Sequence, residues 1–147
     1  MHLLITIPVA ANLQTVKAGF TESLFKALAP PFPKVDLVHF GGSKAGDKVH
    51  VRLNFPLLPA QNWISDITAD AETENQWYFI DKGIELPFFL GYWEHKHIVT
   101  QHTSHTTITE DITFKGPWWL PDFLLYPALY LQFSTRKKVY QQLFGKA

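Results

Sequence analysis

The hydrophobic pattern between residues 34 and 114 has a period of two, and no other feature of the sequence limits the fold as strongly. In residues 48–55, KVHVRLNF, every second side chain is apolar and those between are polar. Because successive side chains of a β-strand point to opposite faces, this alternation is typical of an antiparallel sheet with one face in water. The connecting segments are polar or contain Gly or Pro, as hairpin loops do. Further strands are predicted at residues 34–40, 62–70, 75–81, 90–100 and 106–114.

The two ends of the chain have different patterns. Residues 2–9 are rich in large apolar and β-branched side chains and predict a first strand. Asn12 then offers a helix N-cap, and Gly19 divides the helical pattern that follows, so we expect two short helices. Pro127 is suited to the first turn of a helix, and no Gly or Pro follows it as far as Phe144, which predicts one long C-terminal helix. The apolar stripe of this helix consists of Leu129, Phe133, Tyr140 and Phe144.

Composition places the chain among folded proteins and excludes several classes of function. Its 147 residues are 46% hydrophobic and 15% aromatic, which predicts a single domain over residues 1–147. Thirteen basic and thirteen acidic residues leave no basic excess for nucleic acid. The chain has no cysteine, which excludes disulfides and thiolate ligands and is compatible with the cytoplasmic location that we expect. No apolar run approaches the roughly 20 residues of a membrane span.

Two histidines lie two residues apart in the stretch 90–100. His95 and His97 share a strand face with Trp93, whereas Glu94 and Lys96 share the opposite face. The face that carries Glu and Lys is the better candidate for solvent, so the histidines are predicted to point inward. A tight hairpin centred on residues 103–104 would place Glu110 directly across from His97, where side chains nearly touch.

Two histidines and a carboxylate can hold zinc or non-haem iron. They can equally line a wet pocket or hydrogen-bond to one another, because buried polar groups need partners. The spacing assures no third strong ligand, so we expect neither a metal nor another cofactor.

Arg136 falls on the apolar stripe of the predicted C-terminal helix, in register with Phe133. A guanidinium cannot be neutralised and is costly to bury without a partner. It either extends to the rim of the core or meets an inward carboxylate, for which Glu110 is the nearest candidate.

Three short motifs stand out in the second half of the chain. They are Trp93-x-His95-x-His97, the stretch from Thr107 to Pro117 that contains Glu110 and Phe114, and Phe133-x-x-Arg136. Together with the order of the elements, they resemble a pattern in small bacterial proteins of the SRPBCC superfamily, where an aspartate more often takes the place of Glu110. This superfamily includes START lipid-binding domains, the birch-pollen allergen family and aromatic polyketide cyclases.

The resemblance covers essentially the whole chain and implies an α+β helix-grip fold. In this fold a curved antiparallel sheet, with two short helices after its first strand, wraps a long C-terminal helix and leaves a ligand cavity between them. Family members include binders, carriers and enzymes, so membership alone does not imply catalysis.

We therefore expect a non-catalytic protein that binds a small, largely hydrophobic molecule. The alternatives are a cyclase or dehydratase in which a histidine and Glu110 form an acid–base pair, and an interaction module that exposes the apolar segment 117–123. Residues 118–126 are expected to be irregular, more mobile than the sheet, and to help gate the cavity. The expected ligand-binding residues are Trp93, His95, His97, Glu110, Phe114, Leu129, Phe133 and Arg136.

Overall fold

The computed structural model describes residues 1–147 and contains one seven-stranded antiparallel sheet in the order β1-β7-β6-β5-β4-β3-β2. Consecutive strands from β2 to β7 pair as neighbours, and β1 pairs with β7 and forms one edge of the sheet. This arrangement confirms the predicted meander. The strands are β1 (His2–Val9), β2 (Lys34–Phe40), β3 (Lys48–Asn54), β4 (Gln61–Glu72), β5 (Gln76–Glu85), β6 (Tyr92–Gln101) and β7 (Thr106–Lys115).

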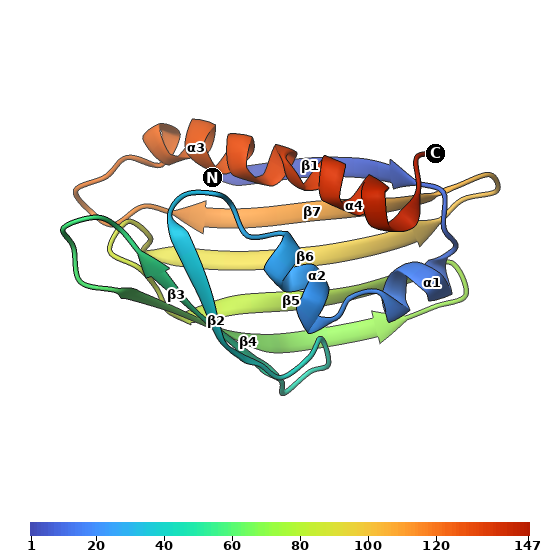
Figure 1. Ribbon diagram of the computed structural model, residues 1–147, viewed down its shortest axis with the longest axis horizontal. Coiled ribbons are helices and arrows are strands. Elements are labelled where there is room, and N and C mark those ends of the chain that lie inside the picture. Colours follow the sequence, from blue (N-terminus) through green and yellow to red (C-terminus); the bar gives the residue numbers. More distant parts are fainter.

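The chain has four helices, and they lie on one face of this sheet (Figure 1). The short helices α1 and α2 link β1 and β2, which are the two edge strands of the sheet. Two further helices, α3 and α4, follow one another in a line above β1 and β7 (Figure 1). The α+β helix-grip prediction is thereby confirmed. The helices are α1 (Leu13–Ala18), α2 (Glu22–Ala27), α3 (Asp122–Ser134) and α4 (Arg136–Phe144).

The two short helices begin at side-chain caps. The Asn12 carboxamide oxygen accepts the backbone N–H of Thr15 at 2.9 Å, as the sequence predicted. Helix α1 ends at Gly19, and Thr21 caps α2 through its hydroxyl group. The positions of α1 and α2 therefore follow from local sequence.

The predicted start of the C-terminal helix is wrong, because α3 begins at Asp122 and contains Pro127 in its interior. The Asp122 carboxylate accepts the backbone N–H of Gly116 at 2.8 Å and lies 3.6 Å from the N-terminal amine, which anchors the first turn. Leu125 is buried in the core one turn later. We infer that these contacts outweigh the helix-breaking cost of the proline. Residues 122–126 are therefore helical, which corrects the expectation that the irregular segment extends to Tyr126.

The helical region is also interrupted at Thr135, where the sequence predicted continuity. The hydroxyl group of Thr135 donates to the carbonyl of Gln132 at 2.6 Å, and that of Ser134 donates to the carbonyl of Leu131 at 2.8 Å. Such back-bonding competes with the helical hydrogen bonds and commonly bends a helix.

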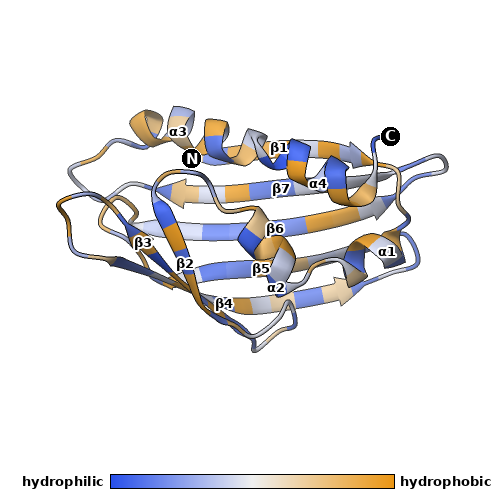
Figure 2. Ribbon diagram, in the orientation of Figure 1, coloured by the Kyte–Doolittle hydropathy of each residue, from blue (hydrophilic) through white to orange (hydrophobic).

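The core consists of two groups of buried residues between the helices and the sheet. One group joins α1, α2 and α4 to the sheet around Phe79 and Tyr140, and the other joins α3 to it around Trp93 and Phe114. The side chains of β6 alternate between half-buried and buried from Tyr92 to Thr100. Figure 2 shows the matching alternation of hydrophobic and hydrophilic residues along the strands.

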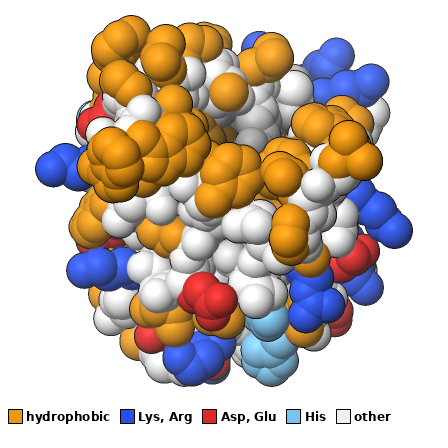
Figure 3. Space-filling view, turned by 90° about the vertical axis from the view of Figure 1, so that its left-hand side faces the viewer, with side chains coloured by type: hydrophobic (Ala, Val, Ile, Leu, Met, Phe, Trp, Pro, Cys, Tyr) orange, Lys and Arg blue, Asp and Glu red, His pale blue; other side chains and the backbone are white.

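One end of the molecule carries exposed apolar side chains on several separate connections. Figure 3 views this end and shows hydrophobic side chains over its upper part. Trp118 is 97% exposed, and Phe88 stacks on Trp119 with ring centroids 6.3 Å apart. No helix is long and apolar enough to cross a membrane. The exposed apolar residues of these connections are Phe32, Leu57, Leu58, Phe88, Trp118 and Trp119.

Candidate functional site

The hairpin of β6 and β7 has the register that the sequence predicted. His97 lies directly across from Glu110, and Gln101 pairs with Thr106 on either side of the turn. His95, His97 and Glu110 all point inward, with 2%, 2% and 0% of their surfaces exposed. Polar side chains buried so completely need partners from other elements.

Glu110 is the acceptor at the centre of this buried group. One carboxylate oxygen accepts Arg136 Nη1–H at 3.1 Å and the hydroxyl group of Tyr140 at 2.6 Å. The other oxygen accepts His95 Nε2–H at 2.6 Å and lies 3.3 Å from His97 Nδ1. The Arg136–Glu110 contact confirms one of the two alternatives for Arg136. Tyr140 was missed as a partner, although it follows Arg136 by four residues and thus shares its helix face.

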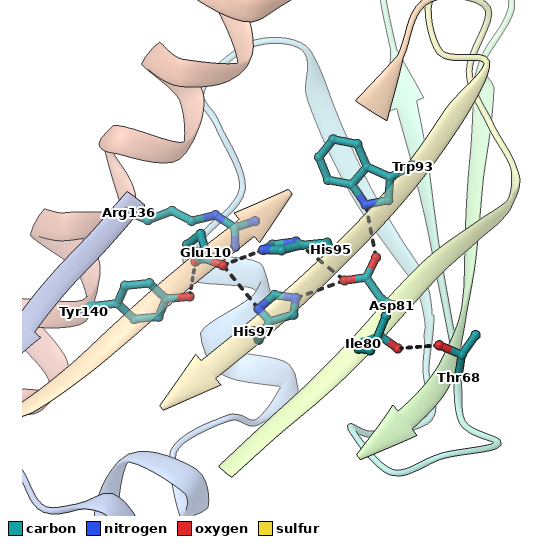
Figure 4. A network of polar contacts seen from close by, with 9 residues as sticks. All are labelled: Thr68, Ile80, Asp81, Trp93, His95, His97, Glu110, Arg136 and Tyr140. Carbon is teal, nitrogen blue, oxygen red and sulfur yellow. Dashed lines mark hydrogen bonds and ion pairs between the residues drawn. The ribbon is translucent and has the colours of Figure 1, made fainter. Parts of the chain in front are cut away.

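A second carboxylate, which the sequence reasoning missed, lies on the other side of the two histidines. Asp81 Oδ2 accepts His97 Nε2–H at 2.9 Å and lies 3.6 Å from His95 Nδ1. Asp81 Oδ1 accepts the indole N–H of Trp93 at 3.1 Å. Figure 4 shows the two imidazoles side by side between Glu110 and Asp81. Alternation could have identified Asp81, which shares a strand face with the buried Phe79.

The carboxylates and His97 stabilise one another's charged forms. Burial alone would raise the pKa of Glu110, but Arg136 and the histidines hold that pKa well below its usual range. Burial also opposes ionisation of Asp81, yet the hydrogen bond from His97 and the nearby imidazoles leave its pKa lowered. For His97, burial lowers the pKa, and the two flanking carboxylates outweigh it and raise the pKa. Of the two imidazoles, His97 is therefore the one whose positively charged form the carboxylates favour.

His95 has the opposite tendency, although its ring centroid lies only 3.7 Å from that of His97. Burial and the charge of His97 lower the pKa of His95. Since a carboxylate only accepts hydrogen bonds, the proton of neutral His95 lies on Nε2, facing Glu110. Its Nδ1 therefore remains an acceptor.

A pocket of about 140 Å³ adjoins this polar group, between the sheet, the segment around α2 and the C-terminal helices. It can be compared with an engineered apolar cavity of about 150 Å³ that binds benzene. The polar part of its wall is formed by Asp81, His95, His97, Arg136, Ser65 and Gln132. The apolar part is formed by Phe25, Leu28, Ala29, Pro30, Val35, Val49, Val51, Leu53, Trp63, Ile67, Phe79, Trp93 and Phe133.

Eight residues were expected to bind the ligand, and five of them line this pocket, namely Trp93, His95, His97, Phe133 and Arg136. The other three lie outside its wall. Glu110 is fully buried and holds the wall residues His95 and Arg136, while Phe114 and Leu129 pack in the core beside Trp93.

Asp81, His95 and His97 could also offer three ligand atoms to a metal ion, since these atoms lie within 4.8 Å of one another. Two features oppose this. The imidazole planes are inclined by only 31° at a centroid distance of 3.7 Å, and such nearly stacked rings are poorly arranged to direct in-plane lone pairs at one ion. His97 Nε2 would also have to lose the proton that it donates to Asp81. Metal binding would therefore compete with the hydrogen bond between His97 and Asp81.

No family model and no curated protein sequence matches the chain. Similar folds do occur among solved structures. The major latex-like protein 151 of Panax ginseng has a TM-score of 0.62 and 16% identity, over 95% of this chain and 96% of that chain. Protein Ms6760 from Mycobacterium smegmatis has a TM-score of 0.61 and 17% identity, over 98% and 88% of the two chains.

The Zhui aromatase/cyclase from a Streptomyces species has a TM-score of 0.51 and 16% identity, over 80% of this chain and 70% of that chain. At these identities the similarity concerns the fold. All three share the antiparallel sheet that curls around a C-terminal helix. The chain described here therefore has the same helix-grip fold as these proteins.

Proposed function

We propose that the protein binds a small, largely apolar molecule in the pocket between the sheet and the C-terminal helices. The observation that carries this proposal is the division of the pocket wall. Aliphatic side chains such as Val49 and Val51 form one part of it, and the polar group of Asp81, His95 and Arg136 forms another. Sites for small molecules commonly combine an apolar lining with a few polar groups that fix orientation.

Within this proposal the residues have separate tasks. Trp93 and Phe133 provide apolar wall, and His95 and Arg136 face the polar end of the ligand. Glu110 does not line the pocket, but its carboxylate accepts hydrogen bonds from both of these side chains and holds them in place. Phe114 and Leu129 support the wall through the core. The absence of cysteine motivates the cytoplasmic location that we include in the proposal.

The test is a titration with benzene, toluene and phenol, followed by NMR of the tryptophan indole N–H groups and by thermal unfolding. Binding to the folded state alone raises the unfolding temperature with ligand concentration. We expect this rise in the parent protein and its loss in Val51→Phe, which fills the pocket. Val38→Phe is the matched control, because Val38 lies on neighbouring β2 and is 48% exposed. Unchanged indole signals and unfolding temperatures with all three probes would overturn the proposal.

A cyclase or dehydratase is the second candidate, and one observation favours it. Neutral His95 presents an unprotonated nitrogen beside the pocket, as a general base requires. In such an enzyme His95 would touch the substrate, and Glu110 would position it. Acetophenone in D₂O tests this, because a base in the pocket should speed exchange of its methyl protons in the parent but not in His95→Gln. Equal exchange rates would leave only the binding role.

A further inference from the structure

Three nitrogen atoms of residues that line the pocket lack a hydrogen-bond partner, namely Arg136 Nε, His97 Nδ1 and His95 Nδ1. Arg136 Nε is buried and makes no hydrogen bond, although Nη1 of the same guanidinium donates to Glu110. His95 Nδ1 also makes none, because the proton of this neutral imidazole lies on Nε2 and is donated to Glu110. His97 Nδ1 lies on the side of Glu110, 3.3 Å from its Oε2. Arg136 thus retains a donor without an acceptor, and His95 an acceptor without a donor.

The protein itself supplies no hydrogen-bond donor to His95 Nδ1. Its nearest carboxylate oxygen, Asp81 Oδ2, lies 3.6 Å away and only accepts hydrogen bonds. Two acceptors thus face each other without a proton between them. Buried polar atoms left in this state are costly, and a ligand that supplies the missing proton removes the cost.

The size of the pocket limits the ligand that can meet these atoms. Its volume of about 140 Å³ is near that of a cavity known to hold one benzene molecule. Phe79 and Trp93 line the pocket together with the aliphatic residues, so a flat apolar ring has wall to contact. One ring with one small polar substituent fits these limits.

We infer that the molecule bound in this pocket is a monocyclic phenol. Its ring lies against the apolar wall, its hydroxyl group donates to His95 Nδ1 or Asp81, and its oxygen accepts an N–H of the Arg136 guanidinium. A hydroxyl group is the smallest substituent that both donates and accepts a hydrogen bond. This inference rests on the proposed function, since it specifies the ligand of the same pocket.

The experiment compares three probes of similar shape by NMR titration of the parent protein. Phenol has both a donor and an acceptor, anisole keeps only the acceptor, and toluene has neither. We expect phenol to bind about tenfold or more tightly than toluene, because the hydrogen bonds involve charged partners. Anisole should bind more weakly than phenol, because it cannot supply the missing proton. In protein labelled with ¹⁵N-histidine, the His95 Nδ1 resonance should shift with phenol and not with toluene.

Two variants test the acceptor side of the inference. Arg136→Lys keeps a cation near Glu110 but removes the planar guanidinium with its N–H donors, so the preference for phenol over toluene should shrink. Lys137→Gln is the matched control, since it removes an exposed cation of α4 outside the pocket and should leave the preference intact.

The possible failures are distinguishable. If toluene binds as tightly as phenol and Val51→Phe abolishes both, the pocket binds apolar molecules and the phenol inference is wrong. If phenol binds equally to the parent and to Val51→Phe, its site lies elsewhere, and the inference is again wrong. If no probe binds the parent, the proposed function fails as well.

Discussion

Arg136 and Glu110 should be energetically coupled, and a double-mutant cycle can measure the coupling. The variants are Glu110→Leu, Arg136→Met and their combination. Glu110 has no exposed surface and accepts hydrogen bonds from Arg136, Tyr140 and His95. Its removal leaves a buried guanidinium without its carboxylate, which typically costs about 3–5 kcal/mol.

Arg136→Met should cost less, because Glu110 keeps its hydrogen bonds from Tyr140 and His95. One hydrogen bond to a charged group is worth roughly 1.5–3 kcal/mol. In the double variant both charged groups are absent, so no buried charge is left without its partner. We therefore expect its cost to be smaller than the sum of the single costs by about 1.5–3 kcal/mol.

Urea denaturation, with the midpoint and the slope fitted for each variant, gives the four free energies of unfolding. Lys138→Met combined with Glu110→Leu is the matched control, because Lys138 is an exposed cation of the same helix. That control pair should be additive. Additivity within about 0.5 kcal/mol for Arg136 and Glu110 would refute the reasoning. If Glu110→Leu does not fold, Glu110→Gln takes its place in the cycle with the same expected sign.

Three further predictions concern acidity, metal content and the exposed end. Because the folded-state pKa of Glu110 lies well below 4.5, its contribution to stability is present above about pH 4.5 and is lost as the pH falls towards the lowered value. The urea midpoint of Glu110→Gln should therefore depend less steeply on pH in this range than that of the parent, and equal slopes would contradict the assignment. Elemental analysis of the purified protein should find no stoichiometric zinc or iron, whereas one ion per chain that disappears in His95→Ala would reverse this expectation. Trp118→Ser should change the free energy of unfolding by less than about 0.5 kcal/mol, because the side chain is 97% exposed. Trp93→Leu, at a side chain 3% exposed, is the buried comparison and should cost more, since it loses core packing and the hydrogen bond to Asp81.

Local features of the sequence were sufficient for the strands, the two short helices and part of the site. Alternation identified the inward face of β6, and the length of the turn after it placed Glu110 across from His97. The cap at Asn12 and the break at Gly19 likewise depend on residues within one turn of the chain. Such features are readable because the backbone geometry that produces them extends over only a few residues.

Tertiary structure alone decided which side chains complete the site and where the C-terminal helix begins. Asp81 faces His95 only because β5 pairs with β6 in one particular register, and Tyr140 reaches Glu110 only because α4 packs over the sheet. Helix α3 includes Pro127 because buried contacts such as those of Leu125 outweigh a local preference. Each of these outcomes depends on free energies of contact between residues far apart in the chain. A periodic pattern fixes the face on which a side chain lies, whereas its partner is fixed only when the elements pack together.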